Sequence, residues 1–424
     1  MCSTWGTASL LASRVVQRLL VDSAVWCLPA HGSACFDMLP ATVEQALTGT
    51  ALGRPLDLGP LAGRYERVLV VYFDAFGWRW YERHAEHPLL EHAREHGQVS
   101  KLTSQFPSTT AAHMTTIHSG VSVGVHGVYE WFTLLPKLNR IIAPLLFSFA
   151  GDALPDTLLS SGVTPDEVYP EADLYARLQH AGIAVHVAFP SAIAASTPTG
   201  MLRRHAIVHP FSQIAEGVTA VGTALGETGR GYGFIYLPDV DATMHRLGPD
   251  HDDVERLIDD TLTVLAQNLV RGHLPERTLI LITSDHGMAA IDPQQTLYVN
   301  EIWPEIVDHI RIGGDGRPLA PAGSSRDLFL HTRPGSHDDV QATLQRLLEG
   351  RAEVYGIAEL VEQGVFGPTL SERFRDRVGD LVALAYPGEA VYWKDPPRFT
   401  QPYFGQHGGL THAEMEIPLI AFIT

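Results

Sequence analysis

Three short, continuous runs of apolar residues constrain the fold of this chain more than any other feature. The runs cover residues 67–74, 233–238 and 278–285, and each ends at or just before an acidic residue. Continuous apolar runs of this length are typical of parallel strands that are covered on both faces of a sheet. Ligands of open α/β sheets bind beyond the carboxyl ends of the strands, so we expect these acidic side chains to converge where chemistry takes place.

Helical patterns alternate with these strands. Residues 251–270 carry apolar side chains at steps of three and four, which predicts a helix with one face packed on the sheet. Residues 171–181 have the pattern of a helix, Gly182 that of a turn, and residues 183–189 that of a strand. This alternation predicts an α/β fold with a doubly wound, mostly parallel central sheet and helices on both faces.

The length of 424 residues fits two or three domains, unless one large sheet domain carries insertions. We expect the core to span residues 61–290 and 401–424. Residues 291–400 are predicted to form a small inserted cap that determines specificity, with a strand at 326–331 and a helix at 336–348.

Two further segments lie outside this core pattern. Residues 1–60 are expected to form an N-terminal helical extension that packs on the core and includes an amphipathic helix at 9–25. Residues 130–168 look like a second insertion, whose apolar patch at 141–149 either lines a pocket or packs internally.

The charge of the chain limits its partners. Thirty basic and 48 acidic residues give a net charge of −18, which argues against binding of nucleic-acid polymers or anionic membranes. An anionic substrate remains compatible with this charge, because bound divalent metal ions reverse the local field. The 21 histidines invite a search for a metal site, because histidine is the commonest metal ligand.

The cysteines and the hydropathy pattern bear on location. Cys2, Cys27 and Cys35 form no C-x-x-C pair, which favours a reducing compartment over a disulfide framework. No run of about 18 uncharged apolar residues occurs, and the first 12 residues make a poor signal peptide. We therefore expect a cytoplasmic protein without stable membrane insertion, with a cleaved leader or peripheral membrane association as the alternative. The oligomeric state stays open.

Acidic residues and histidines recur at the predicted strand ends. Taken one at a time, such an aspartate is more often a helix N-cap and such a histidine a surface or core residue. Three carboxylates and three imidazoles at one edge are different, because the like charges repel unless cations neutralise them. Two divalent ions would do so. The residues concerned are Asp74, Asp241, His245, Asp285, His286 and His407.

A hydroxyl-rich turn precedes a helix in residues 106–120. The N-terminus of a helix binds phosphate through its free backbone amides, and a hydroxyl placed there becomes a nucleophile if it also contacts a metal ion. The alternative is an ordinary capped helix with Thr109 or Thr110 as the N-cap residue.

The order and spacing of these motifs resemble the alkaline phosphatase superfamily and, within it, the type I phosphodiesterase and nucleotide pyrophosphatase family. The resemblance spans about residues 67–424 and implies an alkaline phosphatase-like fold. It rests on the first strand with Asp74, Phe106-Pro-Ser-Thr-Thr-Ala111, Asp241-Ala-Thr-Met-His245, Ser284-Asp-His-Gly-Met288 and Gly405-Gln-His-Gly-Gly409.

The resemblance implies two groups of metal ligands. One ion is expected on Asp241, His245 and His407, and the other on the four residues Asp74, Thr110, Asp285 and His286. Zinc suits such mixed ligands best, and manganese or iron occupy related sites. Thr110 is expected to attack the phosphorus of a small phosphate ester and to form a covalent phospho-threonine that water then hydrolyses.

Other functions remain open on this scaffold. The alternatives to a phosphodiester or nucleotide pyrophosphate hydrolase are a phosphomonoesterase, a mutase or a phosphonate hydrolase. A sulfatase is weakly supported, because no Cys-x-Pro-x-Arg motif occurs. A metal-binding protein without catalysis is the alternative from another class.

Three positions are ambiguous. Asp239 and Asp241 both precede His245, and only Asp241 has the four-residue spacing of the family motif. His412 is an alternative to His407 as a metal ligand. We prefer His407 because it lies in a glycine-flanked turn. His113 stands where the family has a phosphate-binding asparagine, so it either donates to a phosphate oxygen or packs beside the helix, and nucleotide substrates are in doubt.

Overall fold

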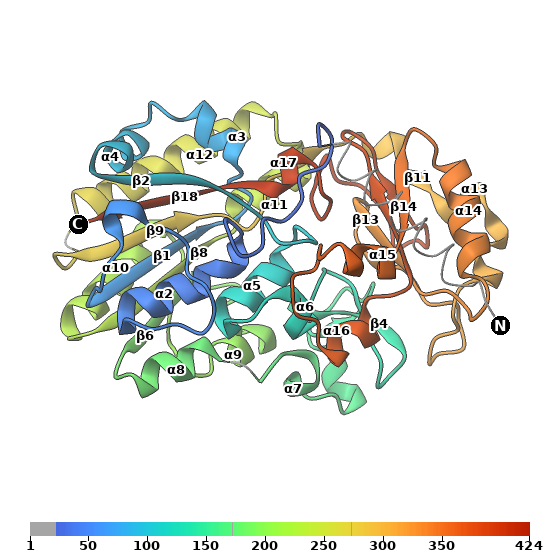
Figure 1. The fold of residues 1–424 in the computed structure, drawn as a ribbon, viewed down its shortest axis with the longest axis horizontal. Coiled ribbons are helices and arrows are strands. Elements are labelled where there is room, and N and C mark those ends of the chain that lie inside the picture. Colours follow the sequence, from blue (N-terminus) through green and yellow to red (C-terminus); the bar gives the residue numbers. More distant parts are fainter. Residues whose placement is uncertain (1–22, 172, 273) are drawn as a thin grey trace, which may run out of the picture.

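The three predicted strands lie side by side at the centre of a sheet. In the computed structural model, which describes residues 23–424 apart from 172 and 273, β1 (Arg67–Phe73) pairs in parallel with β8 (Gly231–Leu237) and with β9 (Thr278–Thr283). Their carboxyl ends therefore share one edge, as the sequence predicts. Figure 1 shows this sheet in one half of the molecule.

Four more strands complete a seven-stranded sheet in the described part of the chain, in the order β2-β18-β9-β1-β8-β6-β7. Strands β6 (Ala184–Pro190) and β7 (Ile207–Phe211) extend the parallel part. Strand β18 (Glu416–Ile423) runs antiparallel between β9 and the edge strand β2 (Gly97–Thr103). The predicted mostly parallel sheet is confirmed, and β2 is an addition that the sequence pattern did not reveal.

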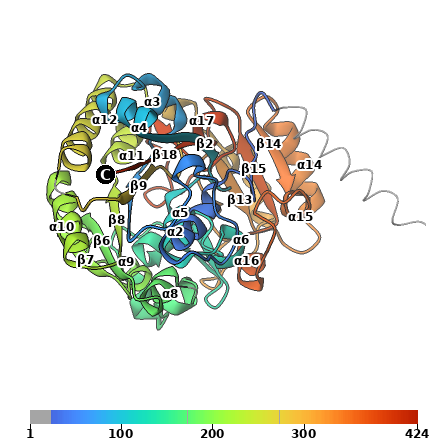
Figure 2. The same cartoon turned by 60° about the vertical axis from the view of Figure 1, so that its left-hand side comes forward.

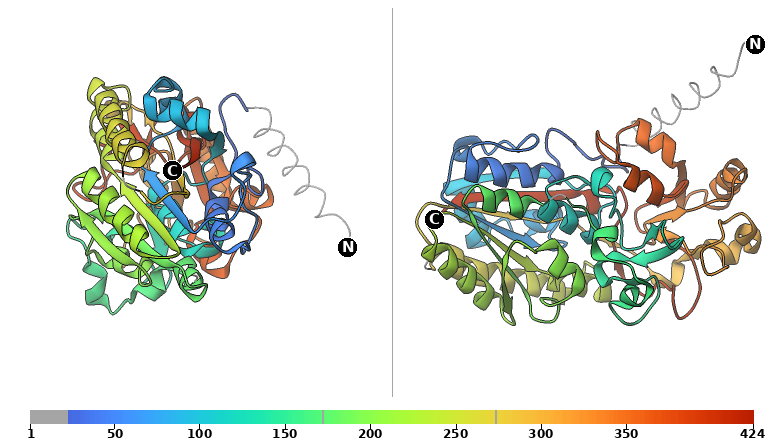
Figure 3. Two further views of the ribbon diagram at one scale, coloured as in Figure 1. Left: turned by 90° about the vertical axis from the view of Figure 1, so that its left-hand side faces the viewer. Right: turned by 90° about the horizontal axis from the view of Figure 1, so that it is seen from below.

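Helices cover both faces of this sheet, because alternate residues of each strand point to opposite sides. Figures 2 and 3 show the sheet between its helices. Val68 and Val70 pack towards α2 (Leu39–Thr48), α5 (Thr110–Ser119) and α8 (Leu174–His180). Leu69 and Val71 pack towards the opposite layer, which consists of α3 (Trp78–Arg83), α4 (Pro88–His96), α10 (Ile214–Glu227), α11 (Asp239–Leu247) and α12 (Asp252–Leu265).

Two helices of the structure have limits that differ slightly from those predicted from the sequence. The helix expected over 251–270 consists of α12 followed by a π-helical turn, Ala266–Val270. The helix expected over 171–181 is α8. Of the predicted 1–60 extension, the described part includes α2, which packs on the sheet. The amphipathic helix expected at 9–25 lies almost wholly outside the described residues.

A second sheet lies in the other half of the molecule (Figure 1). Its antiparallel strands are β12 (Ala322–Gly323), β13 (Asp327–Leu330), β15 (Leu381–Ala385) and β14 (Ala352–Gly356). Its helices are α13 (Val299–Ile302), α14 (His337–Leu347), α15 (Ile357–Glu362) and α16 (Glu372–Arg377). These elements fall within residues 291–400. The division of the chain into core, extension and cap stays our proposal.

Residues 130–168 form a small antiparallel sheet of β3 (Thr133–Leu135), β4 (Arg140–Ala143) and β5 (Ser148–Phe149). Ile142 and Phe147 are buried against Ala111 of α5, so this part of the apolar patch packs internally. The remaining short elements are α6 (Val123–His126), α7 (Pro165–Val168), α9 (Thr197–Leu202), β10 (Ala289–Ala290), β11 (Leu297–Tyr298), β16 (Val391–Tyr392), β17 (Gly405–Gln406), α17 (His412–Met415) and the 3-10 turns Phe36–Met38, Gly59–Leu61, Pro144–Leu146, Thr157–Ser161, Pro293–Gln295 and Pro304–Asp308.

No helix within the described residues combines the length and apolar character that a membrane crossing requires.

Candidate metal centre

The predicted ligands meet at the carboxyl edge of the main sheet. Asp74 follows β1, Asp285 and His286 follow β9, and α11 begins directly after β8 and Pro238. His407 follows β17, which pairs with β10 just downstream of β9. The close approach at His407 depends on Gly408, whose φ is 123° and where an added Cβ would lie 2.7 Å from Asp327 Oδ1.

The first group consists of Asp241, His245 and His407, whose potential ligand atoms all lie within 4.8 Å of one another. Asp241 and His245 are four residues apart on α11 and therefore share one face of that helix. Asp241 Oδ1 is 3.4 Å from His245 Nε2 and 3.7 Å from His407 Nε2. The structure thus brings together the three residues predicted for one ion.

The second group centres on His286. Its Nε2 lies 3.1 Å from Asp285 Oδ2, 3.6 Å from Asp74 Oδ1 and 3.1 Å from the hydroxyl oxygen of Thr110. Ligand atoms of Asp74, Asp241 and His286 also lie within 4.8 Å of one another. Asp241 belongs to both groups and so lies between the two predicted ion positions.

The three histidines are oriented by the backbone. In each ring Nδ1 carries the proton, because it donates to a carbonyl oxygen: His245 to Gly405 at 2.8 Å, His286 to Gly287 at 2.8 Å and His407 to Ser108 at 2.9 Å. Each Nε2 then faces the carboxylates and is the atom available to a metal ion. Metal-binding histidines are held in this way by their second nitrogen.

Hydrogen bonds also orient two of the carboxylates. Asp74 accepts a hydrogen bond from the Tyr236 hydroxyl on Oδ2 at 2.6 Å, and Asp285 accepts one from the Ala75 amide on Oδ1 at 3.3 Å. Asp74 Oδ1, Asp241 Oδ1 and Asp285 Oδ2 are buried and find no hydrogen-bond partner among the described residues. A cation between these carboxylate oxygens and the imidazole Nε2 atoms would satisfy both, so the donor set fits divalent metal ions.

The electrostatics of the site agree with this interpretation. Burial, reinforced by the charge of Asp285, holds the pKa of Asp74 well above its usual range, and burial also raises the pKa of Asp241. Burial opposes ionisation of Asp285 as well, but the neighbouring His286 outweighs it and lowers the pKa of that carboxyl. Burial and the nearby His286 depress the pKa of His407. The repulsion among the carboxylates is what a bound cation would relieve.

Thr110 is the first residue of α5, and Thr109 is its N-cap residue. The turn before it is tied to the His407 turn, because the Ser108 hydroxyl donates to the Gly409 carbonyl at 2.7 Å and accepts from the Gly408 amide at 3.2 Å. The predicted nucleophile Thr110 and the predicted ligand His407 are therefore held by one shared set of hydrogen bonds. The first turn of α5 also leaves backbone amides free beside Thr110.

The ambiguous residues take distinct places. Asp239 is exposed, whereas Asp241 lies in the site. His412 belongs to a different cluster, with Cys27 and Glu416. His113 is fully buried: its Nδ1 donates to the Thr109 carbonyl at 2.8 Å, and its Nε2 accepts from the Gln105 amide at 2.9 Å. Both ring nitrogens are engaged within the protein, so these contacts favour the packing alternative over a contact with substrate.

Several supporting residues escaped the sequence analysis. Tyr236 orients Asp74, and Ser324 donates to Asp327 Oδ1 at 2.6 Å beside the backbone of His407. Arg326 and Glu414 form a buried two-point ion pair with both contacts at 3.0 Å, which joins the second sheet to the segment after His407. These pairings join distant segments, and no local sequence signal marks them.

A cavity of about 590 Å³ adjoins the metal centre. Its walls include Asp241 and His407 from the site, Glu130 and Trp131 from the segment before β3, and Tyr392 from β16. The cavity therefore places aromatic and acidic side chains from residues 130–168 and 291–400 against the predicted ligands.

This fold, with clustered carboxylates and imidazoles beyond the parallel strands, defines a member of the alkaline phosphatase superfamily. Residues 68–410 match the family model "Type I phosphodiesterase / nucleotide pyrophosphatase". The chain belongs to that family, and the predicted fold class and resemblance are confirmed.

Named relatives agree with this membership. The human ectonucleotide pyrophosphatase/phosphodiesterase family member 7 is 24% identical over 245 residues, which cover 54% of this chain and 49% of the relative. The rat counterpart is 23% identical over 245 residues, covering 55% and 53%. The chain spans about half the length of these curated relatives.

Solved structures share the fold. Murine ectonucleotide pyrophosphatase/phosphodiesterase 5 superposes with a TM-score of 0.63 and 21% identity, over 84% of this chain and 87% of that one. Phosphonoacetate hydrolase from Sinorhizobium meliloti, in complex with phosphonoformate, has a TM-score of 0.57 and 17% identity, over 84% and 89%. At these identities the likeness concerns the fold alone.

Proposed function

We propose that this protein is a metal-dependent phosphodiester hydrolase that acts through a covalent intermediate on Thr110. The observation that carries the proposal is the position of the Thr110 hydroxyl, at the start of α5 and 3.1 Å from His286 Nε2, beside three carboxylate oxygens that lack hydrogen-bond partners among the described residues. Family membership supports the same chemistry.

Two divalent ions fit the donor set. Asp241, His245 and His407 would hold one ion, and Asp74, Thr110, Asp285 and His286 the other. When bound, such ions lower the pKa of a hydroxyl group or of water and stabilise the charges on the attacking and leaving oxygens.

The chain's own residues supply the nucleophile and its orientation. In the first step, Thr110 Oγ1 loses its proton and forms a bond to phosphorus while the bond from phosphorus to the leaving oxygen breaks. In the second step, water adds to phosphorus and the bond to Thr110 breaks, which restores the hydroxyl. Backbone amides of the first turn of α5 are placed to hold a phosphoryl oxygen in both steps.

The substrate we propose is a small phosphodiester with an organic group that fits the adjoining cavity of about 590 Å³. A solved relative, an inactive threonine-to-alanine variant of murine ectonucleotide pyrophosphatase/phosphodiesterase 5, is in complex with AMP, which supports a nucleotide-sized ligand. The phosphonoacetate hydrolase neighbour supports phosphonate cleavage as the second candidate.

Hydrolysis assays distinguish these functions. Metal-loaded protein should cleave bis-p-nitrophenyl phosphate faster than p-nitrophenyl phosphate and phosphonoacetate, and a chelator should abolish the activity. Asp241→Asn should lose the activity, whereas Asp239→Asn, which removes the same charge from an exposed position of the same helix, should retain it. Equal loss in both variants, or no cleavage of any of the three compounds by metal-loaded protein, would contradict the proposal.

Zinc identity and a cytoplasmic location are also part of the proposal. Mixed imidazole and carboxylate ligands support zinc. Free thiols at Cys27 and Cys35 support a reducing compartment.

A further inference from the structure

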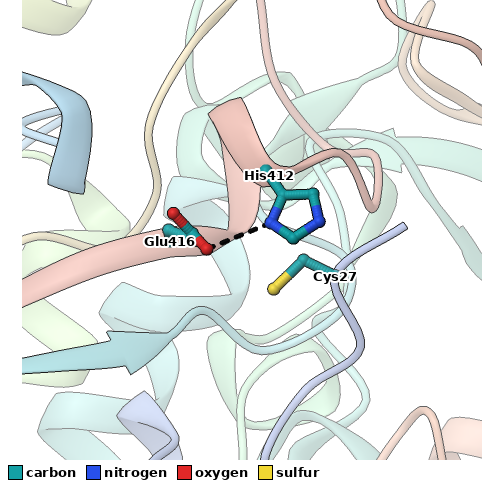
Figure 4. A group of neighbouring side chains, drawn as sticks. All are labelled: Cys27, His412 and Glu416. Atoms are coloured by element: carbon teal, nitrogen blue, oxygen red, sulfur yellow. Dashed lines mark hydrogen bonds and ion pairs between the residues drawn. The ribbon is translucent and has the colours of Figure 1, made fainter. Parts of the chain in front are cut away.

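A second group of potential metal ligands lies outside the predicted phosphoesterase centre. Cys27, His412 and Glu416 each offer one ligand atom, and these atoms lie within 4.8 Å of one another. Figure 4 shows the thiol, the imidazole and the carboxylate turned towards one another. Cys27 precedes α2, whereas His412 begins α17 and Glu416 begins β18, so the cluster joins segments from opposite ends of the chain.

Backbone contacts hold these segments together independently of the three side chains. The Cys27 amide donates to the Leu410 carbonyl at 2.7 Å, and Trp26 forms an antiparallel bridge with Thr411. His412 and Glu416 are four residues apart across the short helix α17. Main-chain contacts therefore hold the backbone of the two segments in register, which lowers the entropy cost of binding an ion between their side chains.

The protonation pattern of His412 points to a positive charge at this place. Its Nε2 lies 2.9 Å from the Ser23 carbonyl oxygen, which only accepts hydrogen bonds, so Nε2 carries a proton. Its Nδ1 then faces Glu416 Oε1 at 3.0 Å. A neutral ring would set a nitrogen lone pair against a carboxylate oxygen, so either a second proton or a metal ion lies between them.

The Cys27 thiol favours the metal ion over the second proton. A proton shared by His412 and Glu416 needs no third group, whereas Cys27 completes a set of sulfur, nitrogen and oxygen donors. Lys101 binds the other oxygen of Glu416, Oε2, at 3.0 Å and leaves Oε1 available to the cluster. The backbone carbonyl on Nε2 of His412 is the kind of outer contact that orients metal-binding histidines.

We propose that Cys27, His412 and Glu416 bind a divalent transition-metal ion of the zinc type. Sulfur together with imidazole selects zinc over magnesium or calcium. The side chains of His412 and Glu416 are 44% and 24% exposed, so water completes the tetrahedral coordination. Binding releases the thiol proton to solvent. The ion would tie the segment before α2 to the start of β18, a few residues after His407.

Cobalt titration tests this site directly, because no residue assigned to the phosphoesterase centre is a cysteine. Thiolate ligation of Co²⁺ produces an intense near-ultraviolet charge-transfer band that imidazole and carboxylate ligands do not produce. Metal-free full-length protein should develop this band on titration with Co²⁺. Cys27→Ser should lose the band and bind one equivalent less metal by equilibrium dialysis.

Three further variants serve as checks. Cys35 belongs to another group of potential ligands, with His31 and Asp37, so Cys35→Ser reports whether the band arises there. The proposal predicts that Cys35→Ser keeps the band. Asp241→Asn should also keep it, which separates this site from the proposed catalytic one. Glu416→Gln should weaken Co²⁺ binding by about 10-fold or more.

Two results would overturn the proposal. One is the absence of a thiolate band in wild type at saturating Co²⁺, which would leave a plain ion pair between His412 and Glu416. The other is a band that persists in Cys27→Ser or disappears in Cys35→Ser or Asp241→Asn. Circular dichroism of the metal-free variants establishes that each one is folded.

Discussion

The Tyr236 hydroxyl donates a hydrogen bond of 2.6 Å to Asp74 Oδ2, and this contact turns Asp74 Oδ1 towards His286 Nε2, 3.6 Å away. Tyr236 lies in β8, next to β1, and is buried. One strand of the sheet thus sets the orientation of a predicted metal ligand on its neighbour.

We expect Tyr236→Phe to weaken metal binding while leaving the fold intact. The variant loses a hydrogen bond to a charged group, worth about 1.5–3 kcal/mol, and such outer contacts change metal affinity by about 10–100-fold. Activity measured against buffered free Zn²⁺ should shift to higher metal concentration and recover at saturation. Tyr232→Phe, four residues earlier in the same strand, is the matched control and should show no shift. Equal metal dependence of Tyr236→Phe and wild type would refute this role.

Asp74→Asn should stabilise the metal-free protein and reduce its stabilisation by zinc. Burial and Asp285 raise the pKa of Asp74 in the folded state, so ionised Asp74 opposes folding at pH values above the unfolded pKa of about 3.9. The metal-free wild type therefore loses stability as the pH rises from about 4 through the folded pKa. Removing the charge should therefore raise the unfolding free energy of the metal-free protein at pH 7.

Thermal unfolding with and without chelator measures this effect. Wild type should melt higher with zinc, and Asp74→Asn should show a smaller zinc-induced rise, because the ligand groups that lack Asp74 still bind metal. Without zinc, Asp74→Asn should melt above metal-free wild type. A variant that melts below metal-free wild type would show that repulsion among these carboxylates is not what the cation relieves.

His126 should make the protein sensitive to acid. Burial lowers its pKa to about 3, whereas the unfolded chain has the ordinary value of about 6.5. Between these values only the unfolded state takes up the proton, so stability falls as the pH falls below about 6.5. The expected slope is up to about 1.4 kcal/mol per pH unit from this group.

His126→Gln removes this proton uptake while an amide can still contact Thr116, whose hydroxyl lies 2.9 Å from His126 Nε2. Urea unfolding at several pH values between 6.5 and 4.5 should give a shallower dependence of the unfolding free energy in the variant. Identical dependence in both proteins would mean that His126 is protonated in the folded state.

Much of the fold could be predicted because its signals are local. The runs before Asp74 and Asp285 are continuous and apolar, so they identify buried parallel strands and place two ligands at strand ends. The four-residue spacing of Asp241 and His245 is equally local, since it puts both side chains on one helix face.

The remainder depends on contacts between distant segments. In the sequence, Tyr236 is one residue of an apolar run. Its contact with Asp74 forms only because β1 and β8 pair in the sheet. The edge strand β2 is only partly buried and lacks a continuous apolar run. The role of His113 depends on which way its ring turns, and motif position does not determine that rotation.

The rate of phosphodiester hydrolysis by Thr110→Ala tests the central claim most directly. Metal-loaded wild type, Thr110→Ser and Thr110→Ala should be compared on bis-p-nitrophenyl phosphate, with zinc content measured in each. We predict that Thr110→Ala loses about 10³-fold or more of kcat while it stays folded, that Thr110→Ser retains part of the rate, and that rapid acid quenching of wild type traps a phosphoryl adduct on Thr110. Full activity of Thr110→Ala, or an adduct on another residue, would contradict the account.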